Sequence, residues 1–534
     1  MTHRYIFSIV LIVVLGMGVG NVFAGWPADA ALNLIVADDV SEQVIPKVAA
    51  TSDGGCFIAW FDHASGNYDV RLQRLDRDGN ALWPHNGILV SDHSQDTWLC
   101  DWDMIADSAD NAVLVFVDPR AGGDWDPYAY RISSDGDFLW GADGVTVAVN
   151  NEFDADPRVA ELTDGSFAVA WSGEGFIGLQ CISSAGVVQY GPTGNAIYEG
   201  AGESPGQARV VASNSGYYIV SWLRDMNFTG SHDLKAMMYS AAGYPAWFSP
   251  LTFYDAGGVP SWYKPLLIPD GAGGAIAAWH RSVGLLYSSF VQRISFGGGE
   301  YFAHNGVEVS TLAGFNHLNP SIAYNTSTNE IFVFWNEEPV DQNQWGVWGQ
   351  KVSAAGARMW GNNGKSFVPM DTIYESYTRC VTVGDGAVVF YFDEPTGSVT
   401  LDRVLAFRVD TDGDFVWPGS TLIVSSILSS KSRLPIVVSP AGVSIAVWED
   451  NRGGTVDLYA QNVNPNGTLG PLGDMNCDGN VNSYDIDGFI CALSPQCDYE
   501  SMYPACNRLL ADCNGDGVPN SYDIDGFIAL VGGG

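Results

Sequence analysis

Short apolar runs rich in Val, Ile, Phe, Tyr and Trp alternate with polar turns through most of the chain. One complete unit extends from Pro46 to Val90 and contains about four such runs. The aromatic residue that ends the second run recurs at intervals of 51–57 residues, at Trp60, Phe116, Trp171, Trp222, Trp279, Trp335, Tyr391 and Trp448. A fixed period of this length indicates a repeat architecture, here of eight units.

Turn residues separate the runs, and other positions recur with the aromatic. Asp-Gly pairs occur at Asp53-Gly54, Asp78-Gly79, Asp135-Gly136, Asp164-Gly165 and Asp412-Gly413. A proline often lies about fourteen residues before the aromatic, at Pro46, Pro157, Pro265, Pro320 and Pro435. Short strands at regular spacing with Gly and Asp turns predict an all-β fold. Four strands per unit, repeated eight times, are typical of the blades of a β-propeller.

The eighth unit stops before its last strand, and the missing part occurs near the other end of the chain. Trp26-Pro27 matches Trp83-Pro84, and the run Leu32–Val36 matches Ile88–Val90. We therefore expect an N-terminal strand to complete the last blade of a propeller over residues 25–470. This closure would remove two exposed sheet edges. Seven blades with a stray unit, or two β-domains, are the alternatives.

The repeated aromatics are expected to pack between blades, because they end the most apolar strand of each unit. A sugar-stacking platform is the alternative, but a binding site rarely needs eight copies. Asp62, Asp69 and Gln73 form a second recurring pattern, which we interpret as hydrogen bonding at turns and strand edges. Calcium ligation is the alternative for these residues.

The first residues are typical of a secretory signal peptide. A short basic start precedes the apolar run Ile6–Gly20, and small or apolar residues precede Ala24. The run is shorter than the roughly 20 residues that span a bilayer, so a membrane anchor is the weaker alternative. We expect residues 1–24 to be cleaved after Ala24 and the protein to be secreted or held at the cell surface, without a membrane span.

Charge and cysteine content limit the function further. The formal charge is −37, from 61 acidic and 24 basic residues. Such a surface repels nucleic acid and anionic membranes, which excludes both as partners. Five of the nine cysteines lie between Cys477 and Cys513, which predicts disulfides in an oxidising compartment. Cys491 and Cys497 are close enough for a local bridge, and Cys477 pairs with either Cys506 or Cys513.

Two twelve-residue segments near the C-terminus share one pattern. Calcium takes about six to eight oxygen ligands, which such a loop supplies from positions 1, 3, 5, 7, 9 and 12, with Gly at position 6. These positions are Asp474, Asn476, Asp478, Asn480, Asn482 and Asp485 in loop one, and Asp512, Asn514, Asp516, Val518, Asn520 and Asp523 in loop two. Position 7 donates its backbone carbonyl, and position 12 is Asp where Glu is usual. The pattern predicts two calcium ions; turns that bind nothing are the alternative.

Each loop leads into an apolar run that begins Ile-Asp-Gly-Phe-Ile, at Ile486–Leu493 and Ile524–Val531. This duplicated loop and helix resembles a type I dockerin over about residues 473–534, within a small α-helical domain of residues 471–534. The resemblance implies a calcium-stabilised module that docks on a cohesin domain, often in polysaccharide-degrading assemblies. Pro519, the cysteines and the segment Cys491–Cys506 depart from the family pattern, which affects the identity of the partner.

In dockerins, loop positions 10 and 11 contribute to partner recognition. The resemblance therefore implies partner contacts at Ser483, Tyr484, Ser521 and Tyr522. Because both loops carry the same pair, it also implies docking in either of two orientations.

Catalysis on the propeller would need residues that break the repeat. Glycoside hydrolysis uses two carboxylates about 5–10 Å apart. Candidates are irregular acidic turns that lead into the innermost strands: Glu42, Asp101, Asp103, Asp154, Asp156, Glu337 and Glu338. Solvated turns are the favoured alternative for each. The sequence contains neither the Gly-x-Ser-x-Gly motif nor the Ser-x-Asp-x-Gly-x-x-Trp box of sialidases, so it identifies no catalytic residue.

These observations support three functions. The leading hypothesis is an exported, non-catalytic propeller that binds carbohydrate or protein and is attached through its dockerin-like module. The second is a glycoside hydrolase or polysaccharide lyase that the same module brings to its substrate. The third is a structural surface protein.

Overall fold

The computed structural model describes residues 25–93, 101–120, 124–200, 202–226, 232–261, 263–397, 400–504 and 506–532. The expected signal peptide and its cleavage site lie outside these residues. None of the helices in these ranges is long and apolar enough to cross a membrane.

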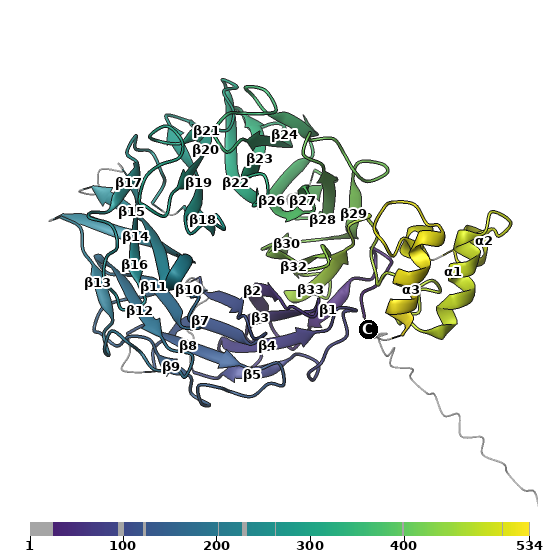
Figure 1. The fold of residues 1–534 in the computed structure, drawn as a ribbon, viewed down its shortest axis with the longest axis horizontal. Coiled ribbons are helices and arrows are strands. Elements are labelled where there is room, and N and C mark those ends of the chain that lie inside the picture. Colours follow the sequence, from purple (N-terminus) through teal and green to yellow (C-terminus); the bar gives the residue numbers. More distant parts are fainter. Residues whose placement is uncertain are drawn as a thin grey trace, which may run out of the picture.

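Within the described residues, eight antiparallel sheets surround a central opening, which confirms the eight-bladed β-propeller (Figure 1). Seven of the sheets have four strands each, and chain order follows sheet order from the innermost strand outward. Blade 1 contains β2 (Gln43–Ala50), β3 (Cys56–Asp62), β4 (Asp69–Leu75) and β5 (Ile88–Ser91), and blade 2 contains β6 (Asp103–Ala106), β7 (Ala112–Asp118), β8 (Asp126–Ile132) and β9 (Val145–Thr146). Blade 3 contains β10 (Ala155–Glu161), β11 (Phe167–Gly173), β12 (Phe176–Ile182) and β13 (Asn195–Ile197), and blade 4 contains β14 (Glu203–Ala212), β15 (Tyr217–Met226), β16 (His232–Ser240) and β17 (Leu251–Tyr254).

Blades 5–7 repeat this arrangement. Blade 5 contains β18 (Leu266–Pro269), β19 (Ala275–Val283), β20 (Leu286–Ile294) and β21 (Val307–Glu308). Blade 6 contains β22 (Phe315–Asn325), β23 (Glu330–Pro339), β24 (Trp345–Val352) and β25 (Lys365–Asp371). Blade 7 contains β26 (Tyr374–Val383), β27 (Gly386–Glu394), β28 (Asp402–Val409) and β29 (Leu422–Ser429).

The last blade joins both ends of the propeller. It contains β30 (Lys431–Ser432), β31 (Ile436–Val438), β32 (Ser444–Asp450) and β33 (Asp457–Val463), and its outer strand is β1 (Leu34–Ala37). β1 pairs antiparallel with β33, with Leu34 opposite Ala460. The prediction that an N-terminal strand completes the last blade is confirmed.

The repeated aromatics form the interior between blades, as predicted. All eight are at most 3% exposed, and the apolar clusters that contain them extend across neighbouring blades. In several blades the indole also donates a hydrogen bond to a carboxylate two residues further on. Trp335 Nε1 lies 2.6 Å from Glu337 Oε2, and Trp448 Nε1 lies 3.0 Å from Asp450 Oδ2. The carboxylate at this position therefore belongs to the repeat.

Most innermost strands contain a β-bulge, which explains the recurring proline. The bulge residue has a positive φ at Ile45, Asp156, Gln207, Asn319 and Tyr377, and Arg433, between β30 and β31, also has a positive φ. Pro46, Pro157 and Pro320 directly follow three of these residues. Proline cannot donate to the ladder and is tolerated at a bulge, where pairing is already interrupted. A bulge also redirects the side chains around it, here beside the central opening.

The C-terminal segment is compact and helical. Helices α1 (Ile486–Leu493) and α3 (Ile524–Val531) each follow one of the two loops, and α2 (Tyr499–Met502) lies between them in sequence. Two disulfides, Cys477–Cys506 and Cys491–Cys497, hold this small core. The local bridge is as predicted, and Cys477 pairs with Cys506, which leaves Cys513 free. Cys477–Cys506 therefore links loop one to the segment that leads into loop two.

Candidate functional site

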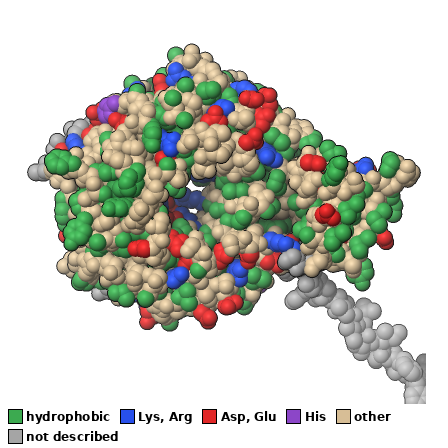
Figure 2. All heavy atoms as spheres, viewed as in Figure 1, with side chains coloured by type: hydrophobic (Ala, Val, Ile, Leu, Met, Phe, Trp, Pro, Cys, Tyr) green, Lys and Arg blue, Asp and Glu red, His purple; other side chains and the backbone are tan. Residues whose placement is uncertain are grey.

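A cavity of about 720 Å³ lies along the innermost strands of blades 5–8. Its wall contains Glu338, Glu375, Arg379 and Arg433, together with aromatic and amide side chains. Lys and Arg side chains are visible within the central opening (Figure 2). Of Glu338, Glu375, Arg379 and Arg433, only Glu338 is among the candidates from the sequence.

The two carboxyl groups of this cavity have different surroundings. Glu338 is 7% exposed and accepts hydrogen bonds from the side chains of Asn316, Gln342 and Trp345. Glu375 is 3% exposed, and its Oε2 has no hydrogen-bond partner in the described structure. Burial, with smaller effects from Asp371 and Asp393, raises the pKa of Glu375 to about 9. Glu375 is therefore protonated and uncharged at neutral pH.

Aromatic and amide groups occupy the same wall. Trp345 and Tyr374 meet edge to face, with ring centroids 5.2 Å apart. Tyr377, at the bulge of β26, lies beside Arg379, whose guanidinium is 5.9 Å from the ring centroid. Asn319 and Asn336 add amide groups to this polar and aromatic lining.

The predicted acidic candidates around Asp101 form a salt-bridge network. Asp101 accepts from Lys47 Nζ at 2.7 Å and from Arg158, and Lys264 Nζ lies 3.5 Å away. Despite burial, these cations hold the pKa of Asp101 well below its usual range. Asp156 accepts from Lys264 at 3.0 Å. These carboxylates are neutralised by fixed cations, and they connect blades 1, 2, 3 and 5.

The remaining acidic candidates are separate from one another. Burial raises the pKa of Asp103, and raises that of Asp154 to about 7. Asp154 accepts a hydrogen bond from Asn150 Nδ2 at 2.8 Å. Glu42, just before β2, accepts a hydrogen bond from the Tyr68 hydroxyl.

The placement of Glu337 and Glu338 on a turn before an innermost strand was wrong. Both lie at the end of β23, the second strand of blade 6. Glu337 occupies the repeated position two residues after the aromatic, is fully buried, and lies 2.6 Å from both Trp335 Nε1 and His317 Nδ1. It therefore belongs to the packing of the blade, whereas its neighbour Glu338 reaches the cavity.

A signal for the missed arginines was present in the sequence. A basic residue recurs two positions after the bulge residue, at Lys47, Arg158, Arg209 and Arg379, and a proline lies between the two positions only before Lys47 and Arg158. This spacing would have identified Arg379, whereas Arg433 stands at the positive-φ position itself and does not follow it.

The two predicted calcium loops have the same backbone hydrogen bonds. In loop one, Asp474 accepts from the amides of Asp478 and Gly479, and Asp485 accepts from those of Asn476 and Asn482. In loop two, the equivalent carboxylates Asp512 and Asp523 make the same four bonds. The glycines at position 6, Gly479 and Gly517, have φ of 86° and 85°, where a side chain would be strained.

Charge and burial in these loops fit a divalent cation. Asp474, Asp485, Asp512 and Asp523 are at most 1% exposed, and none of them has an ion pair with a described Lys, Arg or His. Burial, followed by Asp485 and Asp478, raises the pKa of Asp474 to about 6. Buried carboxylates without a cation are costly.

The ligand shell would need more than carboxylates. Counting only His, Cys, Asp and Glu side chains, no group of three or more within the described ranges is arranged to hold a metal ion. Asn476, Asn482 and the backbone carbonyl of Asn480 would have to supply further oxygens in loop one. The calcium ions therefore remain a prediction that the donor chemistry fits.

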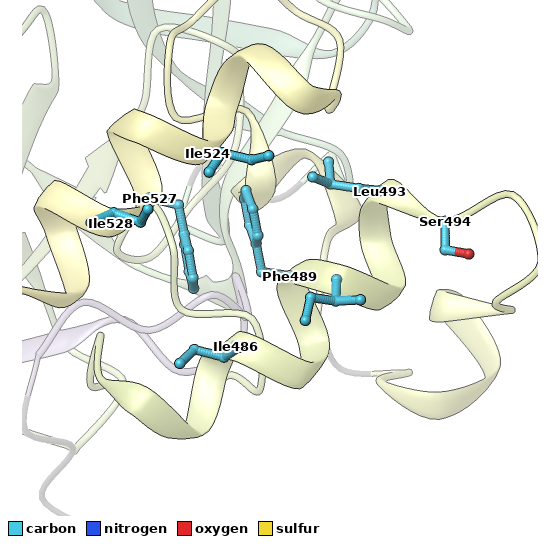
Figure 3. A pocket seen from close by; sticks show the side chains of 8 residues that line it. Ile486, Phe489, Leu493, Ser494, Ile524, Phe527 and Ile528 are labelled. Atoms are coloured by element: carbon cyan, nitrogen blue, oxygen red, sulfur yellow. The ribbon is translucent and has the colours of Figure 1, made fainter.

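The residues predicted to contact a partner lie at the start of an exposed surface. Ser483 and Ser521 are exposed, and Tyr484 and Tyr522 are 79% and 81% exposed. Between α1 and α3, the rings of Phe489 and Phe527 stack 3.9 Å apart in an apolar groove of about 460 Å³ (Figure 3). The groove is lined in matching pairs by Ile486 and Ile524, and by Ile490 and Ile528.

The comparisons with known proteins do not identify a family. No family model and no curated protein matches the chain. Among solved structures, an alpha-L-arabinanase of Penicillium chrysogenum shares 13% identity and covers 60% of this chain and 97% of its own, with a TM-score of 0.33. The polysaccharide lyase Uly1 shares 11% identity and covers 82% and 92%, with a TM-score of 0.40. The Dos1 propeller shares 12% identity and covers 79% and 93%, with a TM-score of 0.43. At these values the likeness assigns no activity to this chain.

Proposed function

We propose that this chain is an exported propeller that binds carbohydrate in its central cavity and is attached through a C-terminal module. The module binds two calcium ions and docks on a cohesin-like protein. The observation that carries the calcium proposal is the set of four buried carboxylates in two equivalent loops, which have no cation of the protein beside them in the described structure. The aromatic and amide lining of the cavity supports carbohydrate binding. The two disulfides support an oxidising compartment.

Calcium has a structural role in this proposal. Each ion would neutralise two buried carboxylates and join the start of its loop to the residue before α1 or α3. The helices would then present their exposed isoleucines in a fixed arrangement. Partner binding is therefore expected to depend on calcium.

Calcium binding is tested by isothermal titration of the disulfide-intact chain of residues 25–534. We expect two equivalents, and one equivalent after either Asp474→Ala or Asp512→Ala, because each substitution removes the first ligand of one loop. Asp143→Ala is the control, because this side chain is 91% exposed and lies in the propeller. A flat titration, or two equivalents in the Asp474→Ala variant, would refute the calcium proposal.

Docking is tested by substitutions on α1 and on α3, the two sides of the apolar groove. The pairs Ile486 with Ile524, and Ile490 with Ile528, support recognition in two orientations. We expect Ile490→Asp and Ile528→Asp to retain most binding to an immobilised type I cohesin as single variants, and the double variant to lose it. Removal of calcium with a chelator should abolish binding. Absence of binding by the wild-type chain, or binding that survives the double variant, would contradict this part of the proposal.

A polysaccharide-degrading enzyme is the second candidate function, and one observation favours it. Glu375 is a protonated carboxyl group at neutral pH and shares a cavity with a second carboxyl group, Glu338. Glycosidases use one protonated carboxyl as the general acid and a second carboxylate as base or nucleophile. Release of reducing ends from a polysaccharide panel, lost in Glu375→Gln and retained in Asp143→Ala, would support catalysis. Binding without turnover would exclude it for that panel.

A further inference from the structure

The basic side chains beside the central opening differ in their partners. Arg209 on β14 donates to the backbone carbonyls of Pro265 and Ala208. Lys47, Arg158 and Lys264 are paired with Asp101 or Asp156, as described above. Arg379 and Arg433, which line the 720 Å³ cavity, have no carboxylate within ion-pair distance among the described residues. Lys264 also lines this cavity and is compensated by Asp156, so among the described lining residues the uncompensated cations are the two guanidinium groups of Arg379 and Arg433.

The surroundings of Arg379 increase this imbalance. Its Nη1 donates to the backbone carbonyl of Thr378 at 2.9 Å, which is its only hydrogen bond to the residues that the structure describes. Burial lowers the pKa of Arg379, and the positive charge of Arg433 lowers it further. The carboxyl group of Glu375 on the same strand does not compensate, because it is uncharged at neutral pH.

Two like charges that line one cavity, here the partly buried Arg379 and the exposed Arg433, are favourable when an anion lies between or beside them. Guanidinium groups match carboxylates and sulfates because they donate two parallel hydrogen bonds to two oxygens. The two carboxyl groups of the cavity wall, Glu338 and Glu375, make no ion pair with either arginine among the described residues, although acidic residues outnumber basic ones by 61 to 24 in the chain.

The rest of the cavity indicates what carries the anionic group. Trp345 and Tyr374 offer aromatic surface, and Asn319 and Asn336 offer amide groups. The volume lies within the range of about 300–1,000 Å³ that small-molecule sites have. Aromatic surface with amides suits sugar rings and their hydroxyls. Arginine clusters also bind acidic peptides, so a short poly-glutamate is included among the probes.

We propose that Arg379 and Arg433 bind the carboxylate or sulfate group of an anionic glycan in the central cavity. This inference rests on the proposed carbohydrate-binding function and specifies its ligand class. The aromatic pair holds the sugar ring, and the two arginines select the charged substituent.

The test measures binding of the full chain, residues 25–534, by isothermal titration. The probes are trigalacturonate, its methyl ester, a hyaluronan tetrasaccharide and a carrageenan oligosaccharide, with inorganic sulfate and a short poly-glutamate as further probes. The variants are Arg379→Gln, Arg433→Gln and the double variant. Lys365→Gln is the charge-matched control, because Lys365 lies on the outer strand β25 and pairs with Asp414. Circular dichroism checks that each variant is folded.

We expect at least one acidic oligosaccharide to bind, and its affinity to fall about tenfold or more in each single arginine variant, while Lys365→Gln is unchanged. The methyl ester should bind at least about tenfold more weakly than trigalacturonate if the latter is the ligand. Because Arg433 is exposed, Arg433→Gln remains informative if Arg379→Gln does not fold.

Other outcomes overturn the inference in distinguishable ways. Neutral glycans that bind as well as acidic ones, with no effect of the arginine variants, would refute the charge selection and leave carbohydrate binding intact. No binding of any oligosaccharide in the panel would refute both. Binding of sulfate alone, or equal binding of poly-glutamate, would refute a glycan as the ligand.

Discussion

Removal of the Trp26 side chain tests whether the N-terminal segment stabilises the ring. Trp26 is 1% exposed and packs in one cluster with Trp60, Leu75 and Ile445, which belong to the first and last blades. Its Nε1 donates to the carbonyl of Arg77 at 3.0 Å. The substitution Trp26→Ala would thus remove a contact that joins the two blades between which the ring closes.

The expected loss follows from the buried area. A buried aromatic side chain covers about 150–250 Å², which corresponds to about 4–6 kcal/mol at about 25 cal/mol per Å². Measured substitutions of core Phe or Trp by Ala cost about 3–5 kcal/mol, and we expect Trp26→Ala to fall in this range. The loss should appear as a lower urea midpoint, followed by far-ultraviolet circular dichroism on the disulfide-intact chain.

Phe248→Ala is the matched control for loss of an aromatic ring. Phe248 is fully exposed, so its removal should change the free energy of unfolding by less than about 0.5 kcal/mol. If Trp26→Ala unfolds at the wild-type midpoint, the N-terminal segment contributes little to the core and the argument for its role is wrong.

Two further predictions concern a buried acid and a disulfide. Glu375 has a folded-state pKa of about 9, above its unfolded value, so this group destabilises the folded protein increasingly as pH rises from about 4.5 to 9. Near pH 4.5, Glu375→Gln should have the same free energy of unfolding as wild type. At pH 8 its free energy of unfolding, measured with urea, should be at least about 1 kcal/mol higher than that of wild type. A midpoint difference independent of pH would contradict this. Cys477→Ser removes the disulfide to Cys506, 29 residues away, and should destabilise the C-terminal segment by about 3–4 kcal/mol. Hydrogen exchange should become faster in α1 and α3 and remain unchanged in the propeller. Cys513→Ser, which removes a free thiol, should leave exchange unchanged, and a matching effect of both would show that the bridge is not the cause.

The number of blades was predictable because one buried aromatic per blade occurs at a nearly constant interval. Ring closure was predictable for the same reason, since Trp26-Pro27 repeats Trp83-Pro84 and the chain leaves the last blade one strand short. The pairing of β1 with β33 follows from these local patterns alone.

The cavity could not be predicted, because it depends on how innermost strands of different blades meet. Glu375 and Arg379 lie on β26 and Arg433 lies beyond β30, and no periodicity relates them to Glu338 on β23. The sequence presented Glu337 and Glu338 as one acidic pair, but alternation along a strand sends them to different surroundings. Both are buried, and their different partners, His317 and Trp335 for Glu337 and Asn316 and Trp345 for Glu338, come together only in the assembled blade.

The closure of the last blade has a consequence for the order in which the protein folds. The side chain of Gln461 donates to the carbonyl of Pro27, 434 residues away. Strand β1 can therefore pair with β33 only after the last blade has been synthesised. Pairing over such a separation slows folding, since the entropy of closing the loop is lost before the contacts form. Until β1 arrives, β33 has an unpaired edge that could recruit the strand of another molecule. Ring closure is thus the step at which this protein is most exposed to aggregation, and a high concentration of nascent chains would favour exchange of the N-terminal strand between molecules.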